Sequence, residues 1–100
     1  MTSRKETIES LNSFQIAETN SFQKRMLSPD LKKYQAKIKE KIYPNPRKNP
    51  FFGANIKQLQ GSLKAIYRYR IGNYRLFYTI DSERKLIFIL DFIHRKNAYR

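Results

Sequence analysis

Two segments in which apolar and polar residues alternate, joined by a pair of turn residues, limit the folds that this chain can adopt. The segments YRYRI (67–71) and YRLFY (74–78) place an aromatic or aliphatic residue at every second position, and Gly72-Asn73 separates them. Period-two alternation is typical of a strand with one buried face, and a two-residue Gly-Asn connection is typical of a tight antiparallel hairpin. A third, hydrophobic segment follows a polar turn. The sequence therefore predicts three antiparallel strands, over residues 64–71, 74–81 and 86–94.

The two-residue turn also fixes which side chains share a face of this hairpin. The turn pairs Ile71 with Tyr74 and, one position further from the turn, Arg70 with Arg75. Along each strand, successive side chains then point to opposite faces of the sheet. One face should pack under helices, and it carries Tyr67, Tyr69, Ile71, Tyr74, Leu76 and Tyr78. The opposite face carries Arg68, Arg70, Arg75 and Phe77.

An excess of positive charge surrounds these arginines. The chain has 21 Lys and Arg against 8 Asp and Glu, a net charge of +13, and it has no acidic residue between Glu40 and Asp81. Arginines directly opposite each other on a sheet repel, so Arg70 and Arg75 cost stability unless an anion binds between them. Such a positive field attracts polyanions. Nucleic acid is the favoured partner, ahead of an anionic membrane or an acidic protein. We therefore predict a phosphate-binding face, with a merely solvated basic surface as the alternative.

The N-terminal half predicts a short strand followed by a short helix. Residues 14–18 (FQIAE) alternate between apolar and polar, as a strand does. The helix should have Asn20 or Ser21 as its N-cap residue. Phe22 and Met26, one turn apart, should form its buried face.

A second helix should begin at Ser28-Pro29-Asp30, which supplies an N-cap hydroxyl, a proline at the first helical position and an acid in the first turn. Pro44 should end this helix, which makes the segment 44–50 (PNPRKNP) an extended connection. Phe51-Phe52 should anchor the connection to the core, and residues 53–61 should form a loop or a single turn. The apolar stripe of the helix, spaced by three and four residues, is Leu31, Tyr34, Ile38 and Ile42.

These elements make one α+β domain over residues 14–100, with the order β-α-α-β-β-β. The two helices should pack on one face of a small antiparallel sheet. The arm before the domain, residues 1–13, has only Ile8 and Leu11 as apolar groups near its middle and is predicted to be loose or marginally helical.

Residue types exclude several kinds of site. The chain has no Cys and a single His, so it offers no zinc site, and its acids lack the spacing of a divalent-metal site. It has no Gly-rich phosphate loop, and we expect no cofactor. No apolar run approaches the roughly 18–20 residues of a membrane span, so we expect no membrane partner. The lack of Cys suits a reducing compartment, and we place the protein in the cytoplasm.

The C-terminal segment resembles a known family of toxins. Residues 59–99 contain LQG, then YRYRIGNYRLFY, the hydrophobic strand LIFILDF, HRK and a near-terminal Tyr. This order of motifs resembles the RelE/ParE superfamily of bacterial type II toxin-antitoxin systems, most closely its RelE-like mRNA interferase branch, over about residues 14–100. The resemblance implies a small toxin that docks in the ribosomal A site and cleaves messenger RNA there without a metal, which inhibits translation. It also implies a cognate antitoxin that holds the toxin inactive.

The resemblance implies roles for individual residues. Arg68 and Arg70 occupy two basic positions before the turn, which are lysines in the best-known RelE members. Arg75 matches the arginine that holds the scissile phosphate. Arg95 matches an arginine near the end of the last strand, and Tyr99 matches a C-terminal tyrosine that stacks on a base and assists the attack.

RNA cleavage of this kind needs proton transfer as well as phosphate binding. The ribose 2′-OH must lose a proton as it attacks the adjacent phosphorus, and the departing 5′ oxygen must gain one. Guanidinium groups are fixed charges near neutrality and carry protons poorly. His94, which has a counterpart in only some branches of the family, is the natural proton carrier because histidine titrates near pH 6.5. Tyr99 is the alternative, if nearby arginines lower its pKa from about 10.

Other residues are predicted to contact RNA without taking part in catalysis. Phe77 and Tyr99 are the aromatic residues expected to face RNA, because most of the others are needed for the core. Lys64, just before the hairpin, is expected to bind RNA together with the arginines. Ribosome docking is expected from lysines that lie off the apolar stripe of the second helix, namely Lys32, Lys33 and Lys37.

Two other functions fit the same sequence. A ParE-like toxin shares the fold but poisons DNA gyrase without doing chemistry itself, and the retained trio Arg75, Arg95 and Tyr99 favours the nuclease over it. A plain nucleic-acid-binding module would only hold the phosphate backbone. The expected partners of the nuclease are a cognate antitoxin, the ribosome and messenger RNA, with operator DNA reached only through the antitoxin.

Overall fold

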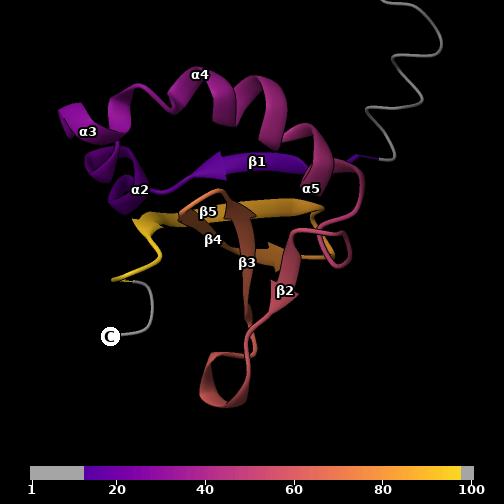
Figure 1. Ribbon diagram of the computed structural model, residues 1–100. Coiled ribbons are helices and arrows are strands. Elements are labelled where there is room, and N and C mark those ends of the chain that lie inside the picture. The colour runs from indigo at the N-terminus through magenta and orange to yellow at the C-terminus, as the bar shows by residue number, and fades with distance from the viewer. Residues whose placement is uncertain (1–12, 98–100) are drawn as a thin grey trace, which may run out of the picture.

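Helices cover one face of a five-stranded sheet in the computed structural model, which describes residues 13–97 (Figure 1). The strand order across the sheet is β1-β5-β4-β3-β2. The strands are Gln15–Glu18 (β1), Ile56–Gln58 (β2), Ile66–Ile71 (β3), Tyr74–Asp81 (β4) and Leu86–His94 (β5). The helical segments are Asn20–Arg25 (α2), Pro29–Lys32 (α3), Gln35–Lys37 (α4), Ile38–Ile42 (η1, a π-helical turn), Pro44–Lys48 (α5) and Gly61–Leu63 (η2, a 3₁₀ turn). The predicted α+β fold class is confirmed. Of the predicted N-terminal arm, residues 1–12 lie outside the described residues.

The predicted hairpin is confirmed in its turn, its register and its faces. Ile71 pairs with Tyr74, and Arg70 pairs with Arg75. Of the two turn residues only Gly72 has a positive φ, 57°, as a type II′ turn requires at its first central position. The residues predicted for the inner face lie in the core or pack against it: Tyr67, Tyr69, Ile71, Tyr74, Leu76 and Tyr78.

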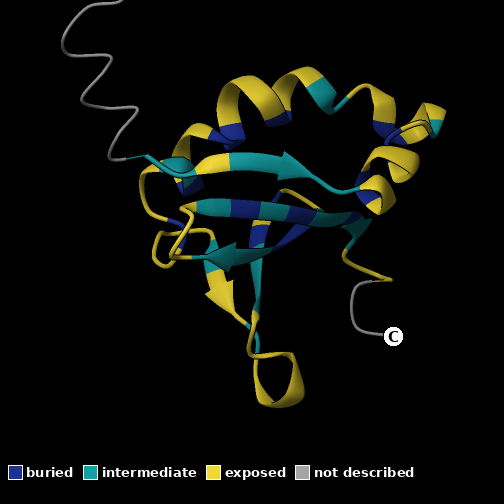
Figure 2. Cartoon of the chain, turned by 180° about the vertical axis from the view of Figure 1, so that it is seen from behind, coloured by how far each residue is buried: buried dark blue, intermediate teal, exposed yellow. Residues whose placement is uncertain are grey.

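The hydrophobic core lies between the helices and the inner face of the sheet. Leu76, Tyr78 and Phe92, on the two middle strands, have no exposed surface. Figure 2 shows buried residues on the middle strands and on the sheet-facing turns of the helices, whereas the outer helix surface and β2 are exposed. The helices bury Phe22, Met26, Leu31, Ile38, Ile42 and Tyr43. Both predicted apolar stripes are therefore confirmed, although Tyr34 is only partly buried.

The predicted second helix is broken into α3, α4 and η1. From Ile38 the backbone widens, and the Tyr43 N–H donates to the Ile38 carbonyl five residues back (2.9 Å). The extra residue in this turn brings Ile38, Ile42 and Tyr43 to the same buried side, which 3.6 residues per turn would not do. The Tyr43 hydroxyl then donates to the Glu18 carboxylate of β1 (2.7 Å). No helix in the described part of the chain is long and apolar enough to cross a membrane.

Two predicted helix boundaries are wrong. The segment 44–48 forms helix α5 and is not extended, because Pro44 and Pro46 both stand in its first turn, where backbone N–H groups have no helical partner. Helix α2 is capped by Thr19 instead of Asn20 or Ser21, and the Thr19 hydroxyl accepts from the backbone N–H of Phe22 (3.2 Å).

The predicted anchor Phe51-Phe52 is half right. The Phe51 ring packs edge-on against Phe14 and Tyr67, at centroid distances of 6.2 and 5.9 Å. Phe52 is 78% exposed and anchors nothing in the described residues.

The two edge strands differ from the prediction of a purely antiparallel sheet. β1 pairs with β5 in parallel, with Ile16 opposite Ile87. A pattern of alternating apolar and polar residues does not show whether two strands pair in parallel or antiparallel. Only a hairpin that joins the two strands fixes their relative direction. The predicted loop 53–61 contains the short antiparallel strand β2, in which Lys57 lies opposite Arg68.

Candidate phosphate-binding face

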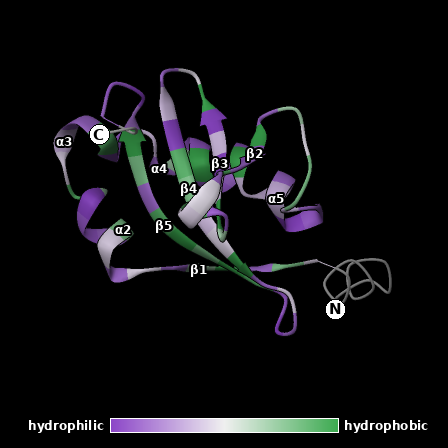
Figure 3. Ribbon diagram, turned by 90° about the horizontal axis from the view of Figure 1, so that it is seen from below, coloured by the Kyte–Doolittle hydropathy of each residue, from purple (hydrophilic) through white to green (hydrophobic). Residues whose placement is uncertain are grey.

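The sheet face away from the helices gathers four basic side chains from three neighbouring strands. Lys57 of β2 lies opposite Arg68 of β3, and Arg70 of β3 lies opposite Arg75 of β4. Figure 3 looks at the molecule from below, the side away from the helices, and shows hydrophilic bands on β3 and β4 between hydrophobic ones. We call this surface the basic face, and its members are Lys57, Arg68, Arg70 and Arg75.

Arg75 is the most enclosed member of the basic face, with 8% of its surface exposed. Its Nη1 donates to the carbonyl oxygens of Gly72 (3.2 Å) and Tyr74 (3.0 Å), which holds the guanidinium against the hairpin turn. These two hydrogen bonds use only the Nη1 end of the Arg75 guanidinium. The edge formed by Nε and Nη2 is the one with which a guanidinium grips two oxygens of a phosphate.

Two guanidinium nitrogens on the basic face are buried without a hydrogen-bond partner in the described residues. They are Nε of Arg75 and Nε of Arg68. A buried donor without an acceptor costs free energy, more when the group is charged. No carboxylate within the described residues forms a salt bridge with an arginine of this face. An anion bound here would supply the missing acceptors and relieve the repulsion between Arg70 and Arg75.

One carboxylate does lie beside the basic face, but another residue holds it. Asp91 of β5 is paired with Phe77 of β4, and Phe77 is paired with Arg68 of β3. The three residues therefore form one row across the sheet. Arg25 of α2 grips Asp91 with two bonds, from Nε (2.8 Å) and Nη2 (3.1 Å). The Asp91 carboxylate raises the pKa of Arg25, through the hydrogen bond first and then through its charge. Asp91 therefore neutralises Arg25 and does not serve the arginines of the basic face.

The predicted RNA-contact residues are only partly gathered here. Phe77 lies on the expected face but is 8% exposed, so little of its ring is available to a nucleobase. Lys64 is exposed in the turn before β3, whereas Arg70 lies near the other end of that strand. Arg95 is exposed, and its backbone N–H donates to the Asn73 carbonyl (2.7 Å), which places it beside the hairpin turn. Tyr99 lies outside the described residues.

His94 is not brought to Arg75. It pairs with Tyr74 on the helix-facing side of the sheet, whereas Arg75 pairs with Ile93 on the opposite side. The His94 ring lies edge-on to Tyr74 at 5.1 Å, and its Nδ1 accepts from the backbone N–H of Lys96 (3.2 Å). The prediction that His94 exchanges protons at the arginine cluster therefore conflicts with the alternation of β5, in which residues 93 and 94 point to different faces.

His94 instead borders a cavity of about 200 Å³ between α3 and the end of β5, which Asp30, Tyr74 and Asn97 also line. Burial raises the pKa of Tyr74, and the nearby Tyr34 and Asp30 raise it further. Tyr74 therefore stays protonated near neutrality and offers no base to this cavity. No group of three or more His, Cys, Asp or Glu within residues 13–97 is placed to hold a metal ion.

The predicted docking lysines lie in the helical layer, across the sheet from the basic face. Lys32, Lys33 and Lys37 are exposed, and Lys33 Nζ lies 5.6 Å from the centroid of the Tyr34 ring. The docking lysines and the basic face therefore belong to separate surfaces of the protein.

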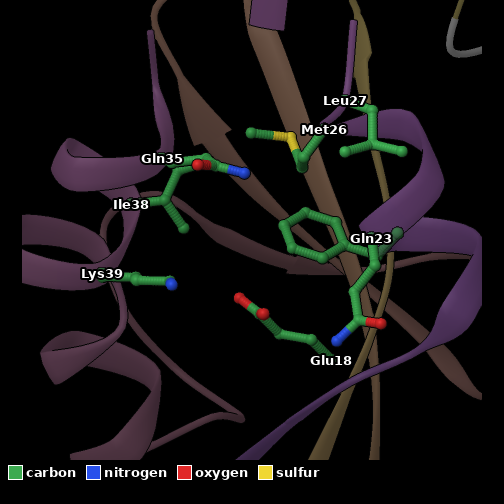
Figure 4. Close-up of a pocket in the computed structure, with 8 residues that line it drawn as sticks. Glu18, Gln23, Met26, Leu27, Gln35, Ile38 and Lys39 are labelled. Carbon is green, nitrogen blue, oxygen red and sulfur yellow. The ribbon is translucent and has the colours of Figure 1, made fainter. Parts of the chain in front are cut away.

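The helical layer also holds a pocket of about 180 Å³ between α2 and the segment α4–η1, and half of its lining residues are polar: Glu18, Gln23, Gln35 and Lys39 (Figure 4). Phe22, Met26 and Ile38 line its apolar part, and Leu27 at its side is 73% exposed. The pocket is separate from the basic face, because its residues come from the helices and from the inner side of β1.

Lys57 is the member of the basic face that sequence reasoning missed. The segment Ile56-Lys57-Gln58-Leu59 has two adjacent polar residues between its apolar ones, so it shows no period-two alternation. The strand is only three residues long, and its sequence carries no signal that could have identified it.

Three comparisons relate this fold to known proteins. Residues 19–99 match the family model described as ParE toxin of type II toxin-antitoxin system, parDE. One chain of the toxin-antitoxin complex RelBE2 from Mycobacterium tuberculosis is 25% identical, with a TM-score of 0.69 over 83% of this chain and 99% of that chain. The search of curated proteins found no match.

Two further solved structures share the fold. A chain of the RelB-RelE antitoxin-toxin complex from Methanococcus jannaschii is 24% identical, with a TM-score of 0.57 over 82% of this chain and 93% of that chain. The YoeB/ParE toxin from Agrobacterium tumefaciens is 15% identical, with a TM-score of 0.62 over 81% of this chain and 98% of that chain. The superfamily predicted from the motifs is confirmed. The family model matches most of the length of this chain, so the chain belongs to the ParE toxin family of type II toxin-antitoxin systems.

Proposed function

We propose that this toxin is a ribosome-dependent endoribonuclease, which acts in the cytoplasm by cutting messenger RNA in the ribosomal A site. The observation that supports this most is the basic face, where Arg68 and Arg75 each keep a buried Nε without a partner in the described residues. A protein rarely leaves two cationic donors unpaired unless a ligand supplies the acceptors. A phosphodiester supplies oxygen acceptors and a negative charge together.

Arg75 is the phosphate clamp in this proposal. Its Nη1 bonds to Gly72 and Tyr74 hold the guanidinium in place before RNA arrives, so little reorganisation is needed when charge develops on the phosphorane oxygens. Arg70, directly across the hairpin, and Arg95, beside the turn, add positive charge to the same end of the sheet. The attack itself is that of the ribose 2′-OH on the adjacent phosphorus, with the 5′ oxygen leaving.

Tyr99 is the proton carrier that we propose for this step. His94 faces the other side of the sheet, and Tyr74 beside it has a raised pKa. A tyrosine hydroxyl among arginines loses its proton more easily than a free one, because nearby positive charge favours the phenolate. Its ring can also stack on a base of the A-site codon.

A ParE-like poison of DNA gyrase is the second candidate, and the match to the ParE toxin family model favours it. The two functions separate in one set of assays with the purified toxin. It is added to programmed ribosomes, to naked RNA of the same sequence and to gyrase with a relaxed plasmid. Cuts confined to ribosome-bound message support the nuclease. Intact RNA with arrested supercoiling supports the gyrase poison.

Ribosome association should depend steeply on salt, because contacts by several Lys and Arg release counterions from phosphates. The log-log slope should correspond to several neutralised phosphates, with about 0.7 from each single-strand contact. Neutralising Lys32, Lys33 or Lys37 should weaken docking and leave the cleavage rate of the bound complex unchanged, because these residues lie across the sheet from Arg75. Binding and single-turnover cleavage are measured over a salt series. An affinity that does not change with salt would contradict electrostatic docking.

A cognate antitoxin should cover the basic face, because a toxin of net charge +13 at rest among abundant RNA needs its field neutralised. We expect an acidic or amphipathic segment that buries on the order of 1,200 Å² or more in total. The pocket beside Leu27, in the helical layer, can seat a side chain from another part of the antitoxin. The structure of the complex checks this expectation. A neutral segment that leaves Arg68, Arg70 and Arg75 open would refute it.

A further inference from the structure

The ion pair between Arg25 and Asp91 lies beside the basic face. Asp91 is opposite Phe77 and Ile93 is opposite Arg75, so Asp91 and Arg75 are diagonal neighbours on the same sheet face. Diagonal neighbours on an antiparallel pair lie about 7–8 Å apart, within reach of long side chains. A free carboxylate at this position would be within reach of the unpartnered edge of Arg75, and RNA would have to displace it.

Arg25 is built into the fold in a position that prevents this. Helix α2 lies beside β5, where Thr19 donates to the Ile89 carbonyl from its backbone N–H (3.2 Å) and from its hydroxyl (2.6 Å). Phe22 and Met26, 3% and 1% exposed, fix the helix in the core. From this rigid base Arg25 makes the two-bonded grip on Asp91 already described, at 2.8 and 3.1 Å.

We propose that Arg25 is a positioning residue that holds the Asp91 carboxylate away from the basic face, so that Arg75 keeps its free edge for a phosphate. The inference rests on the proposed function, because it takes phosphate as the ligand of Arg75. Arg25 itself does not touch RNA in this proposal. Its effect on RNA binding therefore passes entirely through Asp91.

Four proteins test the proposal: the wild type, Arg25→Ala, Asp91→Asn and the double variant. The probe is a 2′-O-methyl hexaribonucleotide of mixed sequence, which cannot be cleaved, and its Kd is measured by fluorescence anisotropy. Arg25→Ala should raise the Kd about 3- to 40-fold, the effect of one charge at about 7.5 Å for an effective dielectric constant between 80 and 20. The double variant should return to within about twofold of the wild type, because the freed carboxylate is gone. Asp91→Asn alone should bind at least as tightly as the wild type.

Arg84→Ala is the matched control. It removes one positive charge that pairs with an aspartate of the sheet, Asp81 at 3.7 Å, but at the far end of β4. It should change the Kd less than twofold. The melting temperature of each variant is measured to check that the fold is retained.

The double variant decides between the mechanisms. If it binds as weakly as Arg25→Ala, then Arg25 contacts RNA itself or only braces α2, and the proposal is wrong. It is also wrong if Arg25→Ala behaves like Arg84→Ala. A different result would show that the proposed function is wrong: Arg75→Ala would bind the probe as well as the wild type. The Arg25 proposal would then also be wrong, because it takes phosphate as the ligand of Arg75. A wild type that binds the probe but cuts no ribosomal message removes only the nuclease step.

Discussion

Arg75→Ala should lower the single-turnover rate of cleavage of ribosome-bound messenger RNA by about 10²-fold or more. The variant loses the fork that holds the phosphate oxygens as charge develops on them. The loss should hardly vary with pH, because a guanidinium does not titrate near neutrality. Arg75→Lys should recover only part of the rate, since an ammonium carries the charge but lacks the planar pair of donors.

Two controls separate this chemical effect from an effect on folding. Arg75 also bonds to the carbonyls of Gly72 and Tyr74, so the melting temperature of Arg75→Ala is measured beside its rate. Arg84→Ala removes a charge from an exposed site at the other end of β4 and should cleave at nearly the wild-type rate. A folded Arg75→Ala protein that cleaves at the wild-type rate would show that Arg75 only braces the turn.

Tyr99→Phe should lower the same rate by about 10²-fold or more, because it removes the one hydroxyl that we propose to carry a proton at the basic face. It should also flatten the alkaline side of the pH profile, where the wild-type rate rises as the phenol ionises. His94→Gln should change the rate by less than about threefold and leave the profile intact, since His94 lies on the helix-facing side of the sheet. Pre-steady-state cleavage between about pH 5.5 and 9 measures both variants.

The opposite pattern would reverse the assignment. If His94→Gln changes the pH profile and costs about 10²- to 10⁴-fold while ribosome binding stays normal, His94 is the proton carrier.

The hairpin was predictable because a single local signal determines it. Gly72-Asn73 fixes the register, the register fixes the faces, and the pairing of Arg70 with Arg75 follows. Simple alternation continued from the pair Asp81 and Leu86 would place His94 on the same face as Arg75. A β-bulge, a shift in register between Phe77 and Tyr78, instead puts Ile93 opposite Arg75 and turns His94 to the helix-facing side. The sequence carries no signal for this bulge, so the separation of His94 from Arg75 could not be predicted.

Features set by packing between distant elements could not be predicted. The parallel direction of β1 depends on its contact with β5, about seventy residues further on, and alternation is silent on direction. The π-helical turn at Ile38 is followed by the hydrogen bond from Tyr43 to Glu18, a partner that no helical periodicity reveals. The grip of Arg25 on Asp91 is likewise a contact across 66 positions of sequence.

Mapping the new RNA ends on programmed ribosomes shows whether the basic face carries out phosphodiester chemistry. We predict a cut within the A-site codon that leaves a 5′-hydroxyl on the downstream fragment and a cyclic or 3′ phosphate on the upstream one. A single 2′-deoxy substitution at the nucleotide before the cut should abolish cleavage, because the attacking oxygen is then missing. An intact message, or a message that is still cut at the deoxy nucleotide, would contradict the proposed mechanism.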